Sequence, residues 1–135
     1  IVEYKWYCFH GKPIFCERIY NQKSNGERII DGYDKDWNLL DYQDIPYKNS
    51  GKKIPKPIFL NEMLNIAQKL SINTYCLRVD FINCDNRIFV GELTFFESGG
   101  YIKYNPESLD RILGSYIKLP TDKVNLIQYK LPRKK

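Results

Sequence analysis

Polar side chains fall at alternate positions in two neighbouring stretches of the sequence that are otherwise mostly apolar. Arg78 and Asp80 interrupt the stretch from 75 to 81, whose odd-numbered residues are apolar. Glu92 and Thr94 occupy even-numbered positions in the stretch from 88 to 95. Strict alternation is the period of a half-buried β-strand, because successive side chains point to opposite faces of a sheet. If these four side chains lie on the same face of the sheet, they could bind a phosphate group together with a metal ion.

The register of the two predicted strands decides whether these groups meet. A two-residue turn at 85–86, which is Asp-Asn and a turn signal, would mix charged and apolar residues on both faces. A three-residue loop at 85–87 gathers the polar groups on one face, because directly opposed residues share a face. Since register follows the buried face, we expect the three-residue loop. The expected pairs are Asp80 with Glu92 and Arg78 with Thr94.

Two adjacent carboxylates indicate what the predicted face would bind. Asp80 and Glu92 repel each other unless a cation lies near them. A hard divalent metal ion bound through oxygen atoms would remove this repulsion, with phosphate as a further ligand. The four polar residues therefore predict a metal and phosphate site on one face of a β-hairpin.

The rest of the chain supplies elements that could position this hairpin. Alternation predicts strands over 1–9, 14–20 and 28–33, which would form an antiparallel meander. Apolar residues at helical spacing predict a helix over 59–70, which would cover the apolar face of the hairpin. A second helix is predicted to begin with Asn105 as N-cap and Pro106 in the first position, and to stop at Gly114. A last segment, 124–129, could be an edge strand. We therefore expect an α+β fold, with an antiparallel sheet covered by helices.

Composition limits the classes of partner. The chain has 135 residues and a net charge of +5, which favours an anionic partner such as a nucleotide or an acidic glycan. Lysine and tyrosine are interleaved, but the lysines are scattered, so we do not expect nucleic acid binding. We also expect no membrane span, because no apolar run approaches the ~20 residues that one needs. There is no basic leader at the N-terminus, so we expect a cytoplasmic protein.

Two further features leave alternatives open. Cys8 and Cys16 could face each other across a hairpin, although we expect reduced cysteines in the absence of a secretory signal. The loop from 34 to 57 could be a lid or an acceptor-binding loop, with Trp37 as its anchor to the core. Within it, Asp34 and Asp36 form an Asp-x-Asp pattern, which glycosyltransferases often use for a metal-bound sugar nucleotide.

Several segments taken together resemble the TupA-like ATP-grasp proteins, which occur in gene sets for teichuronopeptide, capsule and other surface polysaccharides. The segments are EYKWYCFHGKP at 3–13, YDKDWN at 33–38, FLNEMLNIAQKL at 59–70, RVDF at 78–81, GELTF at 91–95 and DRILGSYIKLP at 110–120. The resemblance implies that residues 1–135 form a single domain, similar to the C-terminal lobe, or later half, of an ATP-grasp module. The preceding lobe would come from elsewhere, such as a second chain or an oligomer, or would be absent.

The resemblance also implies roles for individual residues. Arg78 would be the catalytic contact to phosphate. Asp80 and Glu92 would hold magnesium, and Thr94 stands where the family usually has an asparagine metal ligand. Lys5 would point at phosphate from a strand that lines the nucleotide cleft. The segment 98–100, Ser-Gly-Gly, would fall on the acceptor side of the cleft.

The implied activity is that of a Mg-ATP-dependent carboxylate–amine ligase in cell-surface polysaccharide biosynthesis. Such an enzyme activates a carboxylate as an acyl phosphate, which an amine then attacks. Its cofactors would be ATP and Mg²⁺, and its substrates an acid and an amine carried by small molecules or glycans. Two alternatives stay open: a glycosyltransferase that uses Asp34 and Asp36, and a non-catalytic module that binds an anionic glycan.

Overall fold

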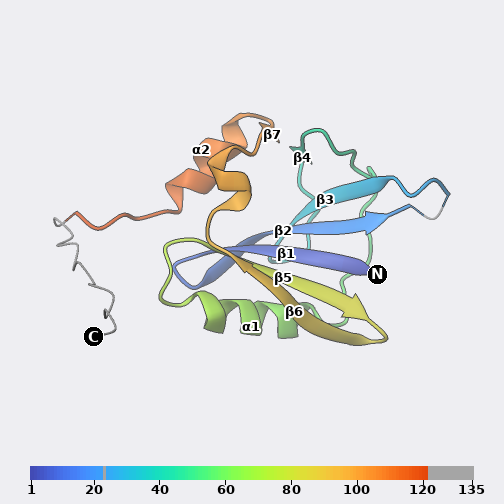
Figure 1. Ribbon diagram of the computed structural model, residues 1–135, viewed down its shortest axis with the longest axis horizontal. Coiled ribbons are helices and arrows are strands. Elements are labelled where there is room, and N and C mark those ends of the chain that lie inside the picture. Colours follow the sequence, from blue (N-terminus) through green and yellow to red (C-terminus); the bar gives the residue numbers. More distant parts are fainter. Residues whose placement is uncertain (23, 122–135) are drawn as a thin grey trace, which may run out of the picture.

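The computed structural model describes residues 1–22 and 24–121, and these form the expected α+β fold (Figure 1). Five strands make one antiparallel sheet in the order β3-β2-β1-β5-β6. Helix α1 covers one face of the sheet, and a small second sheet, β4-β7, lies with helix α2 at the other face. The strands are β1 (Val2–Phe9), β2 (Lys12–Asn21), β3 (Arg28–Asp34), β4 (Gln43–Asp44), β5 (Leu77–Cys84), β6 (Arg87–Thr94) and β7 (Tyr104–Asn105). The helices are α1 (Leu60–Ser71) and α2 (Ser108–Ser115), with a 3₁₀ turn at Glu97–Gly100.

Strands β1, β2 and β3 confirm the predicted antiparallel meander. The first turn is His10-Gly11, where both residues have positive φ angles, and β2 begins directly after it at Lys12. Trp6, rather than Cys8, is therefore opposite Cys16. All four cysteines are free thiols, so the Cys8–Cys16 disulfide does not form.

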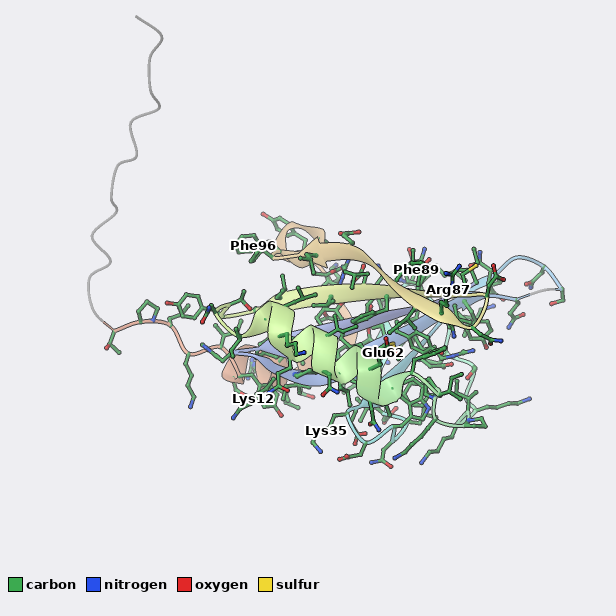
Figure 2. The ribbon with its side chains drawn as sticks, turned by 90° about the horizontal axis from the view of Figure 1, so that it is seen from below. Lys12, Lys35, Glu62, Arg87, Phe89 and Phe96 are labelled. Carbon is green, nitrogen blue, oxygen red and sulfur yellow. The ribbon has the colours of Figure 1, made fainter. Side chains whose placement is uncertain are left out.

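Helix α1 confirms the predicted amphipathic helix within one residue at each end. Met63 and Ala67 are buried against Val79 and Phe81 of the hairpin. Figure 2 shows the helix lying across this face of the sheet. Truncating a buried methionine such as Met63 to alanine typically costs about 2–5 kcal/mol, so this contact helps to hold β5 in place beneath its polar face.

The hairpin of β5 and β6 reaches the predicted pairing by a different route. Its turn is the two-residue Asp85-Asn86, with both φ angles positive, so the predicted three-residue loop is wrong. A β-bulge then leaves Gly91 without a partner between the pairs Phe81–Val90 and Asp80–Glu92. One extra residue on one strand restores the register, and Asp80 faces Glu92 as expected.

The loop between β3 and α1 is fixed to the core by Trp37, as predicted. The Trp37 ring is fully buried and stacks on Tyr33, with ring centroids 4.1 Å apart. Its indole Nε1–H donates a hydrogen bond to the carbonyl oxygen of Ile54, 3.2 Å away. The loop is thus tied to the protein at both of its ends.

The predicted start and end of the second helix are wrong. Asn105 pairs with Gln43 in the β4-β7 sheet and does not cap α2, which begins at Ser108. Gly114 lies inside the helix. A two-residue strand pairing between positions about sixty residues apart leaves no periodic signal in the sequence, so the capping pattern misleads here. The predicted strand at 124–129 lies outside the described residues. Among the helices that the structure describes, none has the length and apolar character needed to cross a bilayer.

Candidate functional site

Four charged residues lie side by side across four strands, on the sheet face opposite α1. Lys5 of β1 is paired with Glu17 of β2 on one side and with Asp80 of β5 on the other. Asp80 is in turn paired with Glu92 of β6. Directly opposed residues on neighbouring strands share a face, so Glu17, Lys5, Asp80 and Glu92 form one row. We call this set the charged row.

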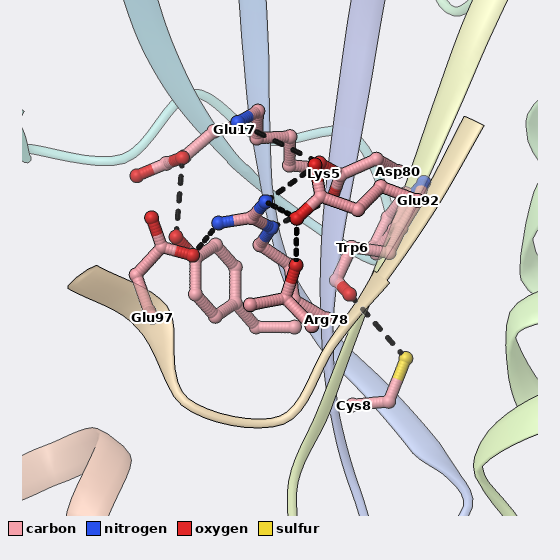
Figure 3. Close-up of polar contacts among 10 residues, drawn as sticks. Lys5, Trp6, Cys8, Glu17, Arg78, Asp80, Glu92 and Glu97 are labelled. Carbon is pink, nitrogen blue, oxygen red and sulfur yellow. Dashed lines mark hydrogen bonds and ion pairs between the residues drawn. The ribbon is translucent and has the colours of Figure 1, made fainter. Parts of the chain in front are cut away.

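Arg78 lies at the centre of the carboxylates in and around this row (Figure 3). Its side chain is 6% exposed. Its Nε and Nη2 atoms donate to the two oxygens of Asp80 at 2.6 and 2.7 Å. Nη2 also donates to Glu92 at 3.3 Å, and Nη1 pairs with Glu97. The guanidinium group thus neutralises charge that would otherwise be concentrated on one face.

Lys5 is a second cation next to Asp80. Its Nζ atom lies 3.6 Å from Oδ2 of Asp80, and its side chain is 16% exposed. Figure 3 shows this side chain extending between the carboxyl groups of Glu17 and Asp80. Lys5 therefore lies on the same face of the sheet as Arg78 and Asp80.

Glu92 and Thr94 form the solvent-facing edge of the site. The Glu92 side chain is 60% exposed, whereas that of Asp80 is 9% exposed. The Thr94 hydroxyl donates a hydrogen bond to Oε1 of Glu92, 2.5 Å away. This hydrogen bond is the main cause that lowers the pKa of Glu92, and the nearby positive charge of Arg78 lowers it further. Glu92 is therefore an ionised carboxylate that a metal ion could reach from solvent.

A cleft of about 390 Å³ opens beside the charged row. Lys5 and Glu17 line its inner side, and residues 97–98 and 101–103 line it from the loop after β6. Ser98, Gly99 and Gly100 all have positive φ angles, and they reverse the chain between β6 and β7. Ser98 of the predicted Ser-Gly-Gly loop therefore borders the cleft, which is where the sequence resemblance puts the acceptor side.

Sequence reasoning missed Glu17 and Glu97. Glu17 is 2% exposed and accepts hydrogen bonds from the hydroxyls of Tyr42 and Tyr7. A signal for Glu17 was present, because it is a lone carboxylate between Phe15 and Ile19 on one face of a strand. No comparable signal exists for Glu97, because the fold of its turn brings it to Arg78.

The Asp-x-Asp pattern at Asp34 and Asp36 serves local structure. One carboxylate oxygen of Asp34 accepts hydrogen bonds from the backbone N–H groups of Asp36 and Asn38, at 2.9 and 2.8 Å. Asp36 pairs with the neighbouring Lys35. Neither aspartate lines the cleft at the charged row. These contacts are those of a surface turn.

The donor set of the site is the kind that magnesium uses with a nucleotide. In the described part of the chain, no three His, Cys, Asp or Glu residues form a group that could hold a metal ion by themselves. Mg²⁺ needs no such group, because it usually binds one or two carboxylates together with substrate phosphates and water. Asp80 and Glu92 supply two carboxylates, and Thr94 adds a hydroxyl beside Glu92. The oxygens of Asp80 keep free lone pairs while they accept from Arg78.

Comparison with known proteins gives one match. A family model described as TupA-like ATPgrasp matches residues 1–118, which include all the residues of the charged row and the loop beside it. No curated protein and no solved structure matches the chain.

Proposed function

The chain belongs to the TupA-like ATP-grasp family, and from this membership we propose that its charged row, Arg78 and the cleft beside them bind the phosphates of Mg-ATP for a carboxylate–amine ligase reaction. The observation that carries the proposal is the charged row. Together with Arg78, it brings three carboxylates, a lysine and an arginine to one face of one sheet. When bound, Mg-ATP supplies the phosphoryl group that activates a carboxylate.

Each residue has a distinct role in this proposal. Asp80, Glu92 and the Thr94 hydroxyl hold the metal ion. Arg78 and Lys5 bind phosphate oxygens, and their positive charges offset the negative charge that develops during phosphoryl transfer. Burial of Arg78 strengthens this effect, since the effective dielectric constant around it is lower than in water.

The remaining parts of the function follow the family. We propose that the substrates are a carboxylic acid and an amine carried by small molecules or glycans, in the biosynthesis of a cell-surface polysaccharide. The reaction would take place in the cytoplasm, where ATP is abundant. We propose that residues 1–135 are the later half of an ATP-grasp module, and that a preceding lobe, in the same protein or in another chain, completes the contacts to adenine.

Calorimetric titration of ATP into the chain, with and without Mg²⁺, tests the proposal. We expect binding that requires Mg²⁺ and weakens at least about tenfold in Asp80→Asn, which loses the charge of one metal ligand. Asp36→Asn is the matched control, because this exposed aspartate pairs with Lys35 and is not part of the charged row. Failure of the wild-type chain to bind Mg-ATP, or equal affinity of Asp80→Asn, would count against the site. Binding of an acidic glycan without Mg²⁺ would favour the non-catalytic module instead.

A further inference from the structure

Glu17 is a buried carboxyl group at the floor of the cleft. It lines the cleft and is 2% exposed. Within the described residues, no lysine or arginine nitrogen lies within 4.0 Å of its oxygens. A buried carboxylate without an ion-pair partner is costly, so such a group gains from a proton or from a cation that enters the cleft. The Mg-ATP contacts proposed above do not use it.

Two tyrosines hold this carboxyl group in place. Tyr42 donates to one oxygen of Glu17, and Tyr7 donates to the other at 3.2 Å. A phenol hydroxyl can donate or accept a hydrogen bond. The same two partners can therefore satisfy Glu17 as a carboxylate and, after one hydroxyl turns, as a carboxylic acid. This arrangement lets Glu17 gain and lose a proton without rebuilding its surroundings.

Burial, with a smaller contribution from the nearby carboxyl group of Asp44, raises the proton affinity of Glu17. Burial raises the pKa of Glu17 to about 7, and the hydrogen bonds from the tyrosines together with the charge of Lys5 limit the rise. The titratable groups that face it are Lys5 and Tyr7 on β1, Tyr42 and Asp44 at β4, and Tyr104 on β7. A carboxyl group that titrates near neutral pH can take up a proton during a reaction at that pH.

The position of Glu17 in the charged row suggests what it acts on. Glu17 and Asp80 flank Lys5 on opposite sides, two strand spacings or about 10 Å apart along the sheet. The Lys5 side chain extends between the two carboxyl groups, so a phosphate group bound by Lys5 would lie beside both of them. We propose that Glu17 is the general base of the cleft and accepts a proton from the ammonium group of the attacking amine. The inference rests on the ligase function proposed above.

The proton balance of this step is complete. The ammonium group gives one proton to the Glu17 carboxylate and becomes a neutral amine. Its nitrogen lone pair forms a bond to the activated carbonyl carbon, and the bond from that carbon to the phosphate oxygen breaks. The amine's second proton leaves with inorganic phosphate, and the amide keeps the third. Glu17 then returns its proton to solvent.

Carbon-13 NMR of the glutamate carboxyl groups tests the proposal. The chain has seven glutamates, and the signal that disappears in Glu17→Gln identifies Glu17. The probe is ethanolamine, a primary amine small enough that poor fit cannot explain a lack of binding. Ethylene glycol with sodium chloride at the same ionic strength is the neutral control. We expect ethanolamine to lower the titration midpoint of Glu17 by about 1 pH unit, since a nearby positive charge favours the carboxylate.

A second measurement follows the amine. Saturation transfer from the protein to ethanolamine should be lost in Glu17→Gln and kept in Glu62→Gln, which changes an exposed glutamate on α1. An unchanged Glu17 midpoint, an equal change with ethylene glycol, or full transfer in Glu17→Gln would each overturn the proposal. Mg-ATP titration of the same samples separates the two ideas. If the chain binds ATP in a magnesium-dependent way but ethanolamine does not change Glu17, only the proposal that Glu17 is the general base is refuted. If the chain does not bind ATP, the proposed ligase site is refuted.

Discussion

Glu17 and Gly32 are directly paired across strands β2 and β3, and the missing side chain at Gly32 leaves room for a tyrosine above it. A Cβ atom at Gly32 would lie 2.6 Å from the Tyr42 ring and 3.0 Å from that of Phe15. The glycine therefore allows the Tyr42 ring to pack against the sheet, where its hydroxyl reaches Glu17. A residue with no side chain thus helps to determine the position of the Glu17 carboxyl group.

Replacement of Gly32 by alanine should separate Tyr42 from Glu17. We expect the free energy of unfolding to fall by about 1–3 kcal/mol, because the added methyl group overpacks the site. Chemical denaturation measures this. Gly114→Ala is the control, since nothing lies within 4 Å of the added Cβ in α2, and it should stabilise the protein by about 0.4–1 kcal/mol. Equal stability of Gly32→Ala and the wild type would show that Tyr42 is not confined there.

Arg78→Met should destabilise the protein strongly at neutral pH. It removes the cation between Asp80, Glu92 and Glu97, and breaking a buried ion pair costs about 3–5 kcal/mol. The loss should shrink at acidic pH, because the Thr94 hydrogen bond and the charge of Arg78 lower the pKa of Glu92, and the stability linked to this shift is lost as the pH falls and Glu92 is protonated. Denaturation at neutral and at acidic pH tests this, with the exposed Arg111→Met on α2 as control. A loss of stability that does not depend on pH would indicate that Arg78 contributes through the packing of its side chain and not through its charge.

Glu17 should make the folded protein less stable as the pH rises through neutrality. Its pKa of about 7 exceeds the ordinary value of 4.5, so between these values the folded state holds a proton that the unfolded chain has already released. Stability linked to Glu17 is therefore complete below about pH 4.5 and decreases as the pH rises to about 7. The total effect is about 3 kcal/mol.

The difference between Glu17→Gln and the wild type isolates this effect from other titrating groups. The variant should gain stability relative to the wild type as the pH increases from 4.5 to 7.5, while Glu62→Gln should show no such trend. Urea denaturation across this pH range provides the measurement. A difference that stays constant with pH would mean that Glu17 has an ordinary pKa.

Lys5→Met should weaken Mg-ATP binding more than it changes stability. Its pair with Asp80 is long, at 3.6 Å, and Arg78 still neutralises Asp80 in the variant, so we expect the free energy of unfolding to fall by only about 1 kcal/mol. A charged contact to phosphate is stronger, and we expect about a tenfold loss of affinity, with a reduced dependence on salt. Calorimetry at low and high salt tests this, with the exposed Lys12→Met as control. Similar losses in both variants would indicate only a general effect of net charge.

The sequence predicted the parts of this protein that depend on buried faces. The pairing of Asp80 with Glu92 followed from keeping apolar residues together against α1, and that requirement holds however the hairpin is closed. The turn itself was wrong because Gly91 corrects the register locally. The start of α2 was wrong because Asn105 is used in a pairing with β4. Glu97 could not be foreseen, since only the path of its turn brings it to Arg78.

The bulge at Gly91 links the length of the hairpin turn to the composition of the site. Removing Gly91 alone would shift the end of β6 by one position and carry Glu92 to the opposite face, away from Asp80. Inserting one residue at Asp85-Asn86 while removing Gly91 would restore the pairing without a bulge. Insertions and deletions in this hairpin should therefore be tolerated in related sequences only as compensating pairs. A turn one residue longer should accompany a β6 strand one residue shorter.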